Sequence, residues 1–160
     1  MIPRWPIASP SGGACLRLGL VLAVLLLAVQ WLFMWATVNG TSMAPTLRNG
    51  QLALIFNQAY RFGLPKRGDL VLVSTGKELL IKRILGLPGE ELRICQSRAY
   101  VDGQPLPEPY LKRTGHWEVG AGRIGPGRYA IVGDNRSGVQ GDSLLAIVKK
   151  DRILGKVICY

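Results

Sequence analysis

The chain has 160 residues, enough for one modest domain with its own core, and its 20 Lys and Arg residues outnumber its 10 Asp and Glu residues. Residues 1–36 contain two arginines and no acidic residue, whereas the remainder is mixed and polar. The cations of the remainder are scattered among turns and apolar runs, without the basic stripe and interleaved aromatics typical of nucleic-acid binding. We therefore expect no nucleic-acid partner, and the excess positive charge suits anionic lipid headgroups.

Residues 18–36 form an apolar run in which Gln30 is the only strongly polar side chain. At helical rise this run spans roughly 30 Å, which is the thickness of the hydrocarbon core of a bilayer. A cleavable secretory signal would have a shorter apolar stretch followed by small residues, but Trp31 and Trp35 occupy the end of this one. The pattern predicts an uncleaved transmembrane helix over 18–36.

Two arginines, Arg4 and Arg17, precede the apolar run and favour a cytoplasmic N-terminus under the positive-inside rule. Residues 1–17 are then a short cytoplasmic tail, and residues 37–160 form a domain on the extracytoplasmic side of the cell (plasma) membrane. The alternative is a helix buried in a soluble protein. It would need a larger partner core than the remaining chain can supply.

Beyond the apolar run, the hydrophobic stretches are short, rich in Val, Ile and Leu, and separated by turn signals such as Asn49-Gly50 and Asp102-Gly103. They predict a mainly β domain. The expected strands lie near residues 51–56, 70–74, 79–85, 91–95, 129–132 and 153–160. Residues 104–127 are dense in Pro and Gly and predict a long surface excursion from the sheet.

Three cysteines, Cys15, Cys95 and Cys159, fit no metal-binding spacing, so we expect no metal site. Cys95 and Cys159 both follow apolar residues. A disulfide between these two in an oxidising exterior and two buried free thiols are alternatives that the sequence leaves open.

A Ser-His-Asp triad would have to use His116, the single histidine of the chain. His116 lies in the Pro- and Gly-rich stretch and has no evident acidic partner nearby. Lone loop histidines are usually solvated, so hydrolytic chemistry in this chain would need another base.

A candidate nucleophile, Ser42, lies just beyond the apolar run between Gly40 and Pro45. Gly40 permits a close backbone approach and Pro45 stiffens the chain, so such a turn can present Ser42 rigidly. An ordinary loop leaving a bilayer would have the same composition, and the segment needs a partner to indicate chemistry.

A candidate base, Lys82, interrupts an otherwise apolar predicted strand and points to the same side as Leu80 and Ile84. Desolvation lowers the pKa of a lysine, and the neutral amine is then a usable general base. Arg83 cannot serve, because a guanidinium stays protonated. The alternative is a lysine on the wet face of a strand.

These segments occur in an order that resembles the sequence boxes of the signal peptidase I family, and the resemblance covers nearly the whole outer domain. The four matching boxes are GTSMAPTL at 40–47, KRGDLVLV at 66–73, IKRILGLPGE at 81–90 and GDNR at 133–136. AYVDGQPLPEPYL at 99–111 is similar to the family's hairpin segment.

The resemblance implies an antiparallel β-sheet serine protease behind a single anchor, which removes signal peptides from secreted precursor proteins without a cofactor. It places the nucleophile at Ser42 and the general base at Lys82. It implies that the Ser42 backbone N–H and the Gly40 position serve the oxyanion, and that Met43 lines a substrate pocket. Substrates would carry small residues at the first and third positions before the cut, and the family usually works as a monomer.

The last box departs from the family pattern GDNR-x-x-S-x-D-S-R, because residues 133–143 read GDNRSGVQGDS and are one residue longer. Counting from either end puts Val139 or Gln140 where the family has the serine that orients the lysine. Ser137, Ser143 or packing alone would have to replace that hydroxyl.

The charged residues of the same box are expected to support the site. Asp134 and Arg136 are in place to form an ion pair near it, and Asp142 is expected to keep a structural role.

Three other functions share parts of this pattern. A specialised relative that processes pilus or conjugation proteins would share the Ser/Lys pair, and only substrates separate it from a general signal peptidase. Self-cleaving repressor domains use Ser and Lys on a related sheet but are soluble, which the apolar run argues against. A catalytically inactive membrane module that binds signal sequences would be unaffected by Ser42→Ala.

Overall fold

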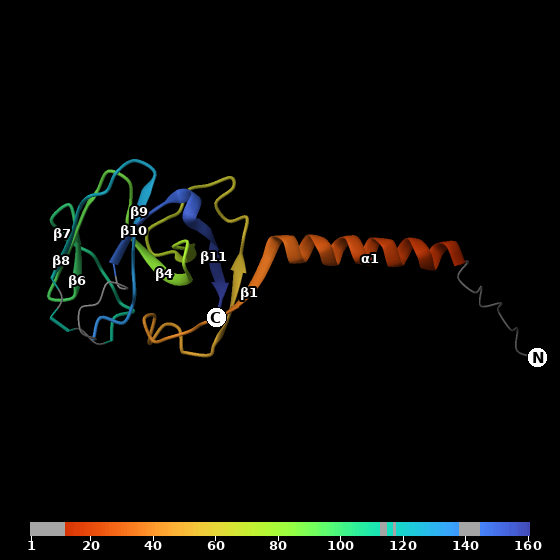
Figure 1. Cartoon of the computed structure of the whole chain (residues 1–160), viewed down its shortest axis with the longest axis horizontal. Helices are drawn as coiled ribbons and strands as arrows, with labels where there is room; N and C mark the ends of the chain where they lie inside the picture. Colours follow the sequence, from red (N-terminus) through yellow and green to blue (C-terminus); the bar gives the residue numbers. More distant parts are fainter. Residues whose placement is uncertain (1–11, 113–114, 117, 138–144) are drawn as a thin grey trace, which may run out of the picture. The chain divides into compact units, whose positions relative to one another are not determined.

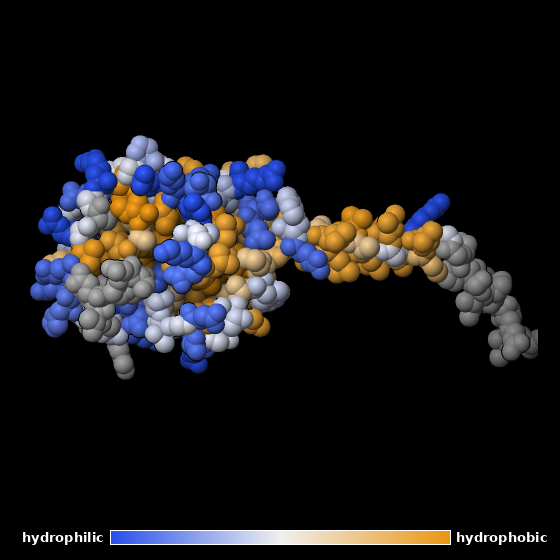
Figure 2. All heavy atoms as spheres, viewed as in Figure 1, coloured by the Kyte–Doolittle hydropathy of each residue, from blue (hydrophilic) through white to orange (hydrophobic). Residues whose placement is uncertain are grey.

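The computed structural model describes residues 12–112, 115–116, 118–137 and 145–160. The chain divides after Leu32 into two units. The described part of the first unit is helix α1 (Gly12–Leu32), which is long and apolar enough to cross a membrane. The most apolar part of this helix is not buried, and Figure 2 shows apolar side chains along its visible length.

The helix begins and ends earlier than the predicted span over 18–36, because residues 33–36 belong to a strand. Strand β1 (Phe33–Thr37) pairs antiparallel with β2 (Leu52–Phe56), with Phe33 opposite Phe56. Apolar and aromatic residues suit a helix and a strand equally by composition. A partner strand was available here, and its ladder of backbone hydrogen bonds decides the conformation.

The described residues of the second unit form two antiparallel sheets (Figure 1). The first has seven strands in the order β1-β2-β11-β3-β4-β9-β10. Besides β1 and β2, its strands are β3 (Leu70–Ser74), β4 (Leu79–Gly86), β9 (Arg128–Val132), β10 (Leu145–Lys149) and β11 (Ile153–Cys159), and the short helix η1 (Lys150–Arg152) precedes β11. The last strand of the chain therefore lies between two early strands, β2 and β3.

The second sheet has four strands in the order β7-β6-β5-β8. They are β5 (Glu91–Cys95), β6 (Arg98–Val101), β7 (Gln104–Pro105) and β8 (Val119–Arg123). The hairpin expected within 99–111 is present as β6 and β7, with Val101 opposite Gln104. The surface excursion expected over 104–127 is partly wrong, because β7 and the Gly-rich β8 pair into this sheet.

The expected fold class, mainly antiparallel β with one N-terminal apolar helix, is confirmed. All six strands expected from the sequence are present. The three cysteines are free: Cys95 lies half-buried in β5 of one sheet, and Cys159 is exposed at the end of β11 in the other. The two thiols are neither paired nor both buried.

Candidate active site

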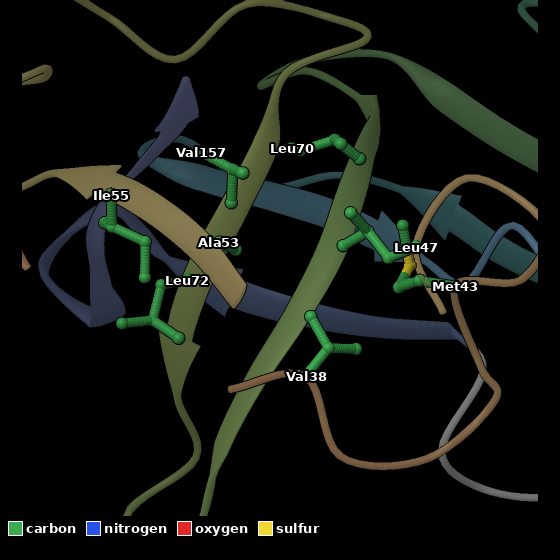
Figure 3. Packing of buried hydrophobic residues seen from close by; sticks show 8 residues of the cluster. All are labelled: Val38, Met43, Leu47, Ala53, Ile55, Leu70, Leu72 and Val157. Carbon is green, nitrogen blue, oxygen red and sulfur yellow. The ribbon is translucent and has the colours of Figure 1, made fainter. Parts of the chain in front are cut away.

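The loop between β1 and β2 carries Ser42 and is anchored in the core by its own apolar side chains. Met43 and Leu47 are 2% and 0% exposed. Both pack into the cluster of Val38, Ala53, Ile55, Leu70, Leu72 and Val157, which Figure 3 shows. Ser42 itself is half-buried. Because the residue that follows Ser42 is held by the core, the position of Ser42 is set by the sheet beneath it.

Hydrogen bonds join this loop to the segment that follows β9. The Asn135 backbone N–H donates to the Ser42 carbonyl at 2.9 Å, and the Asn135 side-chain amide donates to the Thr41 carbonyl at 3.0 Å. The Thr46 hydroxyl donates to Asp134 Oδ2 at 2.5 Å. The first and the last of the four sequence boxes are therefore in direct contact.

Strand β4 positions Lys82, which is only 2% exposed. Lys82 lies opposite Val71 on β3 and shares its face of the sheet with Leu80 and Ile84. The ion pairs found among the described residues do not include Lys82. Burial lowers the pKa of Lys82, while the negative charges of Glu78 and Asp134 oppose this shift without cancelling it. The expectation of a desolvated lysine, not one on a wet face, is confirmed.

The neighbours of Lys82 link β4 to the Ser42 loop. Arg83 pairs with Asp134, with Nη2 to Oδ2 at 2.6 Å and Nε to Oδ1 at 2.9 Å, and the same carboxylate accepts the Thr46 hydroxyl. Ile81 packs against the cluster that contains Met43. Both residues adjacent to Lys82 therefore contact groups that hold the loop of Ser42.

A cavity of about 210 Å³ lies beside Ser42, between its loop and β4. Its lining is largely apolar. The lining residues are Ala36, Thr37, Val38, Asn39, Ser42, Met43, Leu72, Leu79, Leu80 and Ile81. A cavity of this size and lining has room for a small apolar side chain beside Ser42.

A second cavity, of about 340 Å³, lies against Ala44, Pro45, Asp134 and Asn135. Residues 42–45 therefore line two cavities, the first two residues one and the last two the other. A larger cavity of about 510 Å³ lies on the second sheet against Cys95 and contains none of the candidate residues.

Gly40 occupies a backbone conformation that favours glycine, with φ of +93°. Its N–H donates to Asn49 Oδ1 at 2.8 Å, so this donor already has an acceptor. Among the described residues, no acceptor is found for the Ser42 N–H. Of the two positions expected to serve an oxyanion, Ser42 therefore has a free donor in this arrangement.

The expected ion pair between Asp134 and Arg136 is wrong, because each side chain pairs with another residue. Asp134 binds Arg83, as described above. Arg136 is fully buried, and its Nη2 lies 2.8 Å from Glu108 Oε1, on the segment that follows β7. Arg136 also donates to the carbonyls of Gly133 and Ser97. It connects the second sheet to the segment that contacts Ser42.

Part of the altered last box lies outside the described residues: Asp142, Ser143, Val139 and Gln140. Ser137 is described, and its hydroxyl donates to Asn135 Oδ1 at 2.7 Å, so it serves the asparagine and not the lysine.

Sequence reasoning missed Thr46, Glu108 and Asn135 as parts of this site. Asn135 lies within a recognisable box, but nothing local marks Glu108, whose partner Arg136 is 28 residues away. His116, the alternative base, is exposed. No group of three or more metal-ligating side chains occurs in the described part of the chain.

Comparisons with known proteins show the family to which the chain belongs. The family model described as signal peptidase, peptidase S26, matches residues 13–160. Signal peptidase I T of Bacillus subtilis (strain 168) is 33% identical over 153 residues, which cover 85% of this chain and 78% of that protein. The probable signal peptidase I-2 of Synechocystis sp. is 32% identical over 127 residues, or 74% of this chain. The chain spans 58% of that relative's length.

A crystal structure of a signal peptidase I from Enterococcus faecalis V583 superimposes with a TM-score of 0.51 and 22% identity. The match covers 59% of this chain and 97% of that one. At this identity the likeness shows the fold alone.

Proposed function

This chain belongs to the signal peptidase family, peptidase S26, and we propose that it is a membrane-anchored serine endopeptidase that removes signal peptides from secreted precursor proteins. One observation carries the proposal. Ser42 borders an apolar cavity whose other wall is β4, the strand that buries Lys82, and Lys82 forms no ion pair with any residue that the structure describes. A hydroxyl, a desolvated amine and a small apolar pocket are the parts that acyl transfer at a small residue requires.

In the proposed mechanism the neutral Lys82 amine accepts the Ser42 proton while Ser42 Oγ attacks the scissile carbonyl carbon. The tetrahedral oxyanion accepts a hydrogen bond from the Ser42 N–H. The Lys82 ammonium then protonates the leaving amine, the peptide C–N bond breaks, and an acyl ester on Ser42 remains. Lys82 next deprotonates a water molecule that attacks this ester, and the proton returns to Ser42 as the signal peptide leaves.

The apolar cavity supports the proposed preference for small residues before the cut. Its volume of about 210 Å³ suits an alanine-sized side chain with room for the adjoining peptide, and its lining includes the buried Met43 and the partly buried Ile81. Because both residues pack into the core cluster, the cavity cannot widen without disturbing that cluster. Larger side chains at this position should be rejected.

We further propose that α1 anchors the protein with its N-terminus in the cytoplasm and the two-sheet unit outside, as a monomer. A surface for anionic lipid is formed by the Phe62 tip, which we define as residues 61–64. Phe62 is 92% exposed and Leu64 is 67% exposed. The Lys150 ammonium donates to the Gly63 carbonyl at 3.2 Å, so a cation lies at the tip. Exposed apolar side chains beside cations are suited to a headgroup region.

Cleavage of a precursor peptide with small residues at the first and third positions before the cut tests the proposal. The detergent-solubilised full chain would be compared with Ser42→Ala and Lys82→Ala over a range of pH. Loss of a residue that forms or activates the nucleophile should lower kcat by at least about 10³-fold. The activity of the unaltered chain should rise with pH through one ionisation below the ordinary lysine pKa of about 10.4, because only the neutral amine accepts a proton.

Lys77→Ala supplies the matched control, since Lys77 is an exposed lysine in the turn that precedes β4. It should leave the rate and the pH profile unchanged. Absence of cleavage by the unaltered chain would favour the inactive binding module. Activity that survives Lys82→Ala would exclude Lys82 as the base and bring His116 back.

A further inference from the structure

We propose that Asn135 is a positioning residue that orients the Ser42 backbone N–H toward the oxyanion of the transition state. The inference rests on the proposed function, in which Ser42 is the nucleophile. It is carried by the two hydrogen bonds that Asn135 makes to consecutive carbonyls of the Ser42 loop, at 3.0 Å to Thr41 and 2.9 Å to Ser42.

The orientation of the Asn135 side chain is dictated by its partners. The backbone N–H of Ser137 lies 3.2 Å from Asn135 Oδ1, and the Ser137 hydroxyl donates to the same oxygen at 2.7 Å. On the other side, the Thr41 carbonyl can only accept. Since an N–H can only donate and a carbonyl can only accept, the amide has one orientation that satisfies both, with Nδ2 toward Thr41.

The planarity of the peptide bond converts this contact into an orientation of the nearby donor. The Thr41 carbonyl and the Ser42 N–H belong to one peptide plane and point in opposite directions. When Asn135 holds the Thr41 oxygen on its own side, the Ser42 N–H is directed away from Asn135. The hydrogen bond from the Asn135 backbone N–H to the Ser42 carbonyl fixes the next peptide plane in the same way. The Met43 N–H of that plane is therefore also directed away from Asn135.

The two N–H groups so directed are available to a ligand. Among the described residues, no acceptor is found for the N–H of Ser42 or of Met43. The Gly40 N–H is instead occupied by Asn49. Donors that are already oriented stabilise a developing oxyanion without a cost of reorganisation. This stabilisation is usually the largest single contribution to the catalysis of acyl transfer.

Asn135 can hold these planes because both of its chain neighbours are anchored. Asp134 is 2% exposed and is paired with Arg83 on β4. Arg136 is fully buried and is paired with Glu108. The amide of Asn135 therefore projects from a segment fixed to both sheets, and a rotation of the Thr41–Ser42 peptide would have to break its hydrogen bond.

Two substitutions remove the side-chain N–H of Asn135 that donates to the Thr41 carbonyl. Asn135→Asp keeps the shape and the acceptor for Ser137 but puts a carboxylate oxygen against the Thr41 carbonyl, and Asn135→Ala removes the amide without adding charge. Removal of one oxyanion donor costs about 10²–10³ in kcat. Here the Ser42 N–H remains, and the Ala44 N–H still donates to the Thr41 carbonyl at 3.0 Å, so the peptide plane is loosened and not released. We therefore expect a smaller loss than that of a whole donor, with kcat falling about 10-fold in both variants and KM unchanged.

A second readout separates positioning from simple structural support. A peptide aldehyde that ends in the small residue before the cut forms a tetrahedral adduct with Ser42, whereas a peptide with proline after the cut binds without reacting. Both variants should weaken the aldehyde by the same factor as kcat/KM and leave the affinity of the proline peptide unchanged. Ser137→Ala removes the hydroxyl donor to Asn135 Oδ1 but keeps the Ser137 N–H and the Nδ2 bond to Thr41, which together still fix the amide orientation. It should change all three quantities less than threefold.

The outcomes are distinguishable. Unchanged kcat and aldehyde affinity in Asn135→Ala, with an active parent chain and inactive Ser42→Ala, would overturn the role of Asn135 and leave the proposed function standing. Equal weakening of both inhibitors would also overturn it, since that is the result of general damage to the site. An inactive parent chain would overturn the proposed function and this inference together.

Discussion

The two loops that flank β2 both contain large apolar residues, which are buried in one loop and exposed in the other. The loop before β2 buries Met43 and Leu47 at 2% and 0% exposure, whereas the loop after it exposes Phe62 at 92% and Leu64 at 67%. Loop side chains in the core fix the backbone between them. Large exposed side chains gain little from folding, and here they form the lipid surface that we propose.

The loop that exposes Phe62 and Leu64 is held at its base by hydrogen bonds and an ion pair. At its base, Asp69 accepts the Tyr60 hydroxyl at 2.9 Å and pairs with Lys156 at 2.6 Å. The tip is therefore presented from a fixed base. One loop holds the Ser42 backbone in place through buried side chains, and the other presents apolar side chains outward.

The largest expected effect contrasts the two loops directly, with Leu47→Ala and Leu64→Ala as a matched pair. Leu47 is fully buried, so its truncation leaves a cavity and should lower the free energy of unfolding by about 2–5 kcal/mol. Leu64 is mostly exposed, and the same truncation should change it by less than about 0.5 kcal/mol. Thermal unfolding of the detergent-solubilised chain measures both. Equal destabilisation would end the distinction between the loops.

Lys82 is as buried as Met43 but carries an ionisable group. Lys82→Met should abolish cleavage and raise the free energy of unfolding by roughly 0.5–2 kcal/mol at neutral pH. Burial lowers the pKa of Lys82 on folding, so the folded state binds fewer protons. The parent chain is destabilised most below the lowered pKa and less and less between that pKa and the ordinary lysine pKa. The advantage of the variant should shrink as the pH rises toward the ordinary lysine pKa.

Unfolding followed at several pH values measures this difference. A Lys82→Met chain that is less stable than the parent at every pH would mean that the buried amine has a favourable partner that is not among the ion pairs of the described residues.

The smallest expected effect concerns the Phe62 tip and leaves stability unchanged. In a chain whose three cysteines are replaced by serine, Phe62→Cys carries a polarity-sensitive fluorophore, and Gln104→Cys on the exposed end of the second sheet carries the control. The fluorescence emission of the label at position 62 should be shifted to the blue in vesicles that contain anionic lipid, compared with vesicles of neutral lipid alone. The emission of the label at position 104 should be the same in both. Equal spectra at both positions would exclude tip insertion.

Many features of this protein could be predicted from short stretches of its sequence. The apolar run, the short alternating strands and the four ordered boxes determined the fold class, the anchor, the family resemblance and the candidates Ser42 and Lys82. These features are legible because hydrophobic periodicity and turn residues act over a few positions. The same local signals placed residues 33–36 in the helix, since composition does not distinguish a helix from a strand that has found a partner.

Tertiary structure decided the contacts between distant segments. Asn135 and Thr41 are 94 residues apart, Thr46 and Asp134 are 88 apart, and neither pair has a local signature. Asp134 could have paired with the nearby Arg136, but β4 brings Arg83 to it and the second sheet brings Glu108 to Arg136. Buried charges take the partner that strand pairing places within reach, because an unpaired charge in the interior is far costlier than a long chain separation.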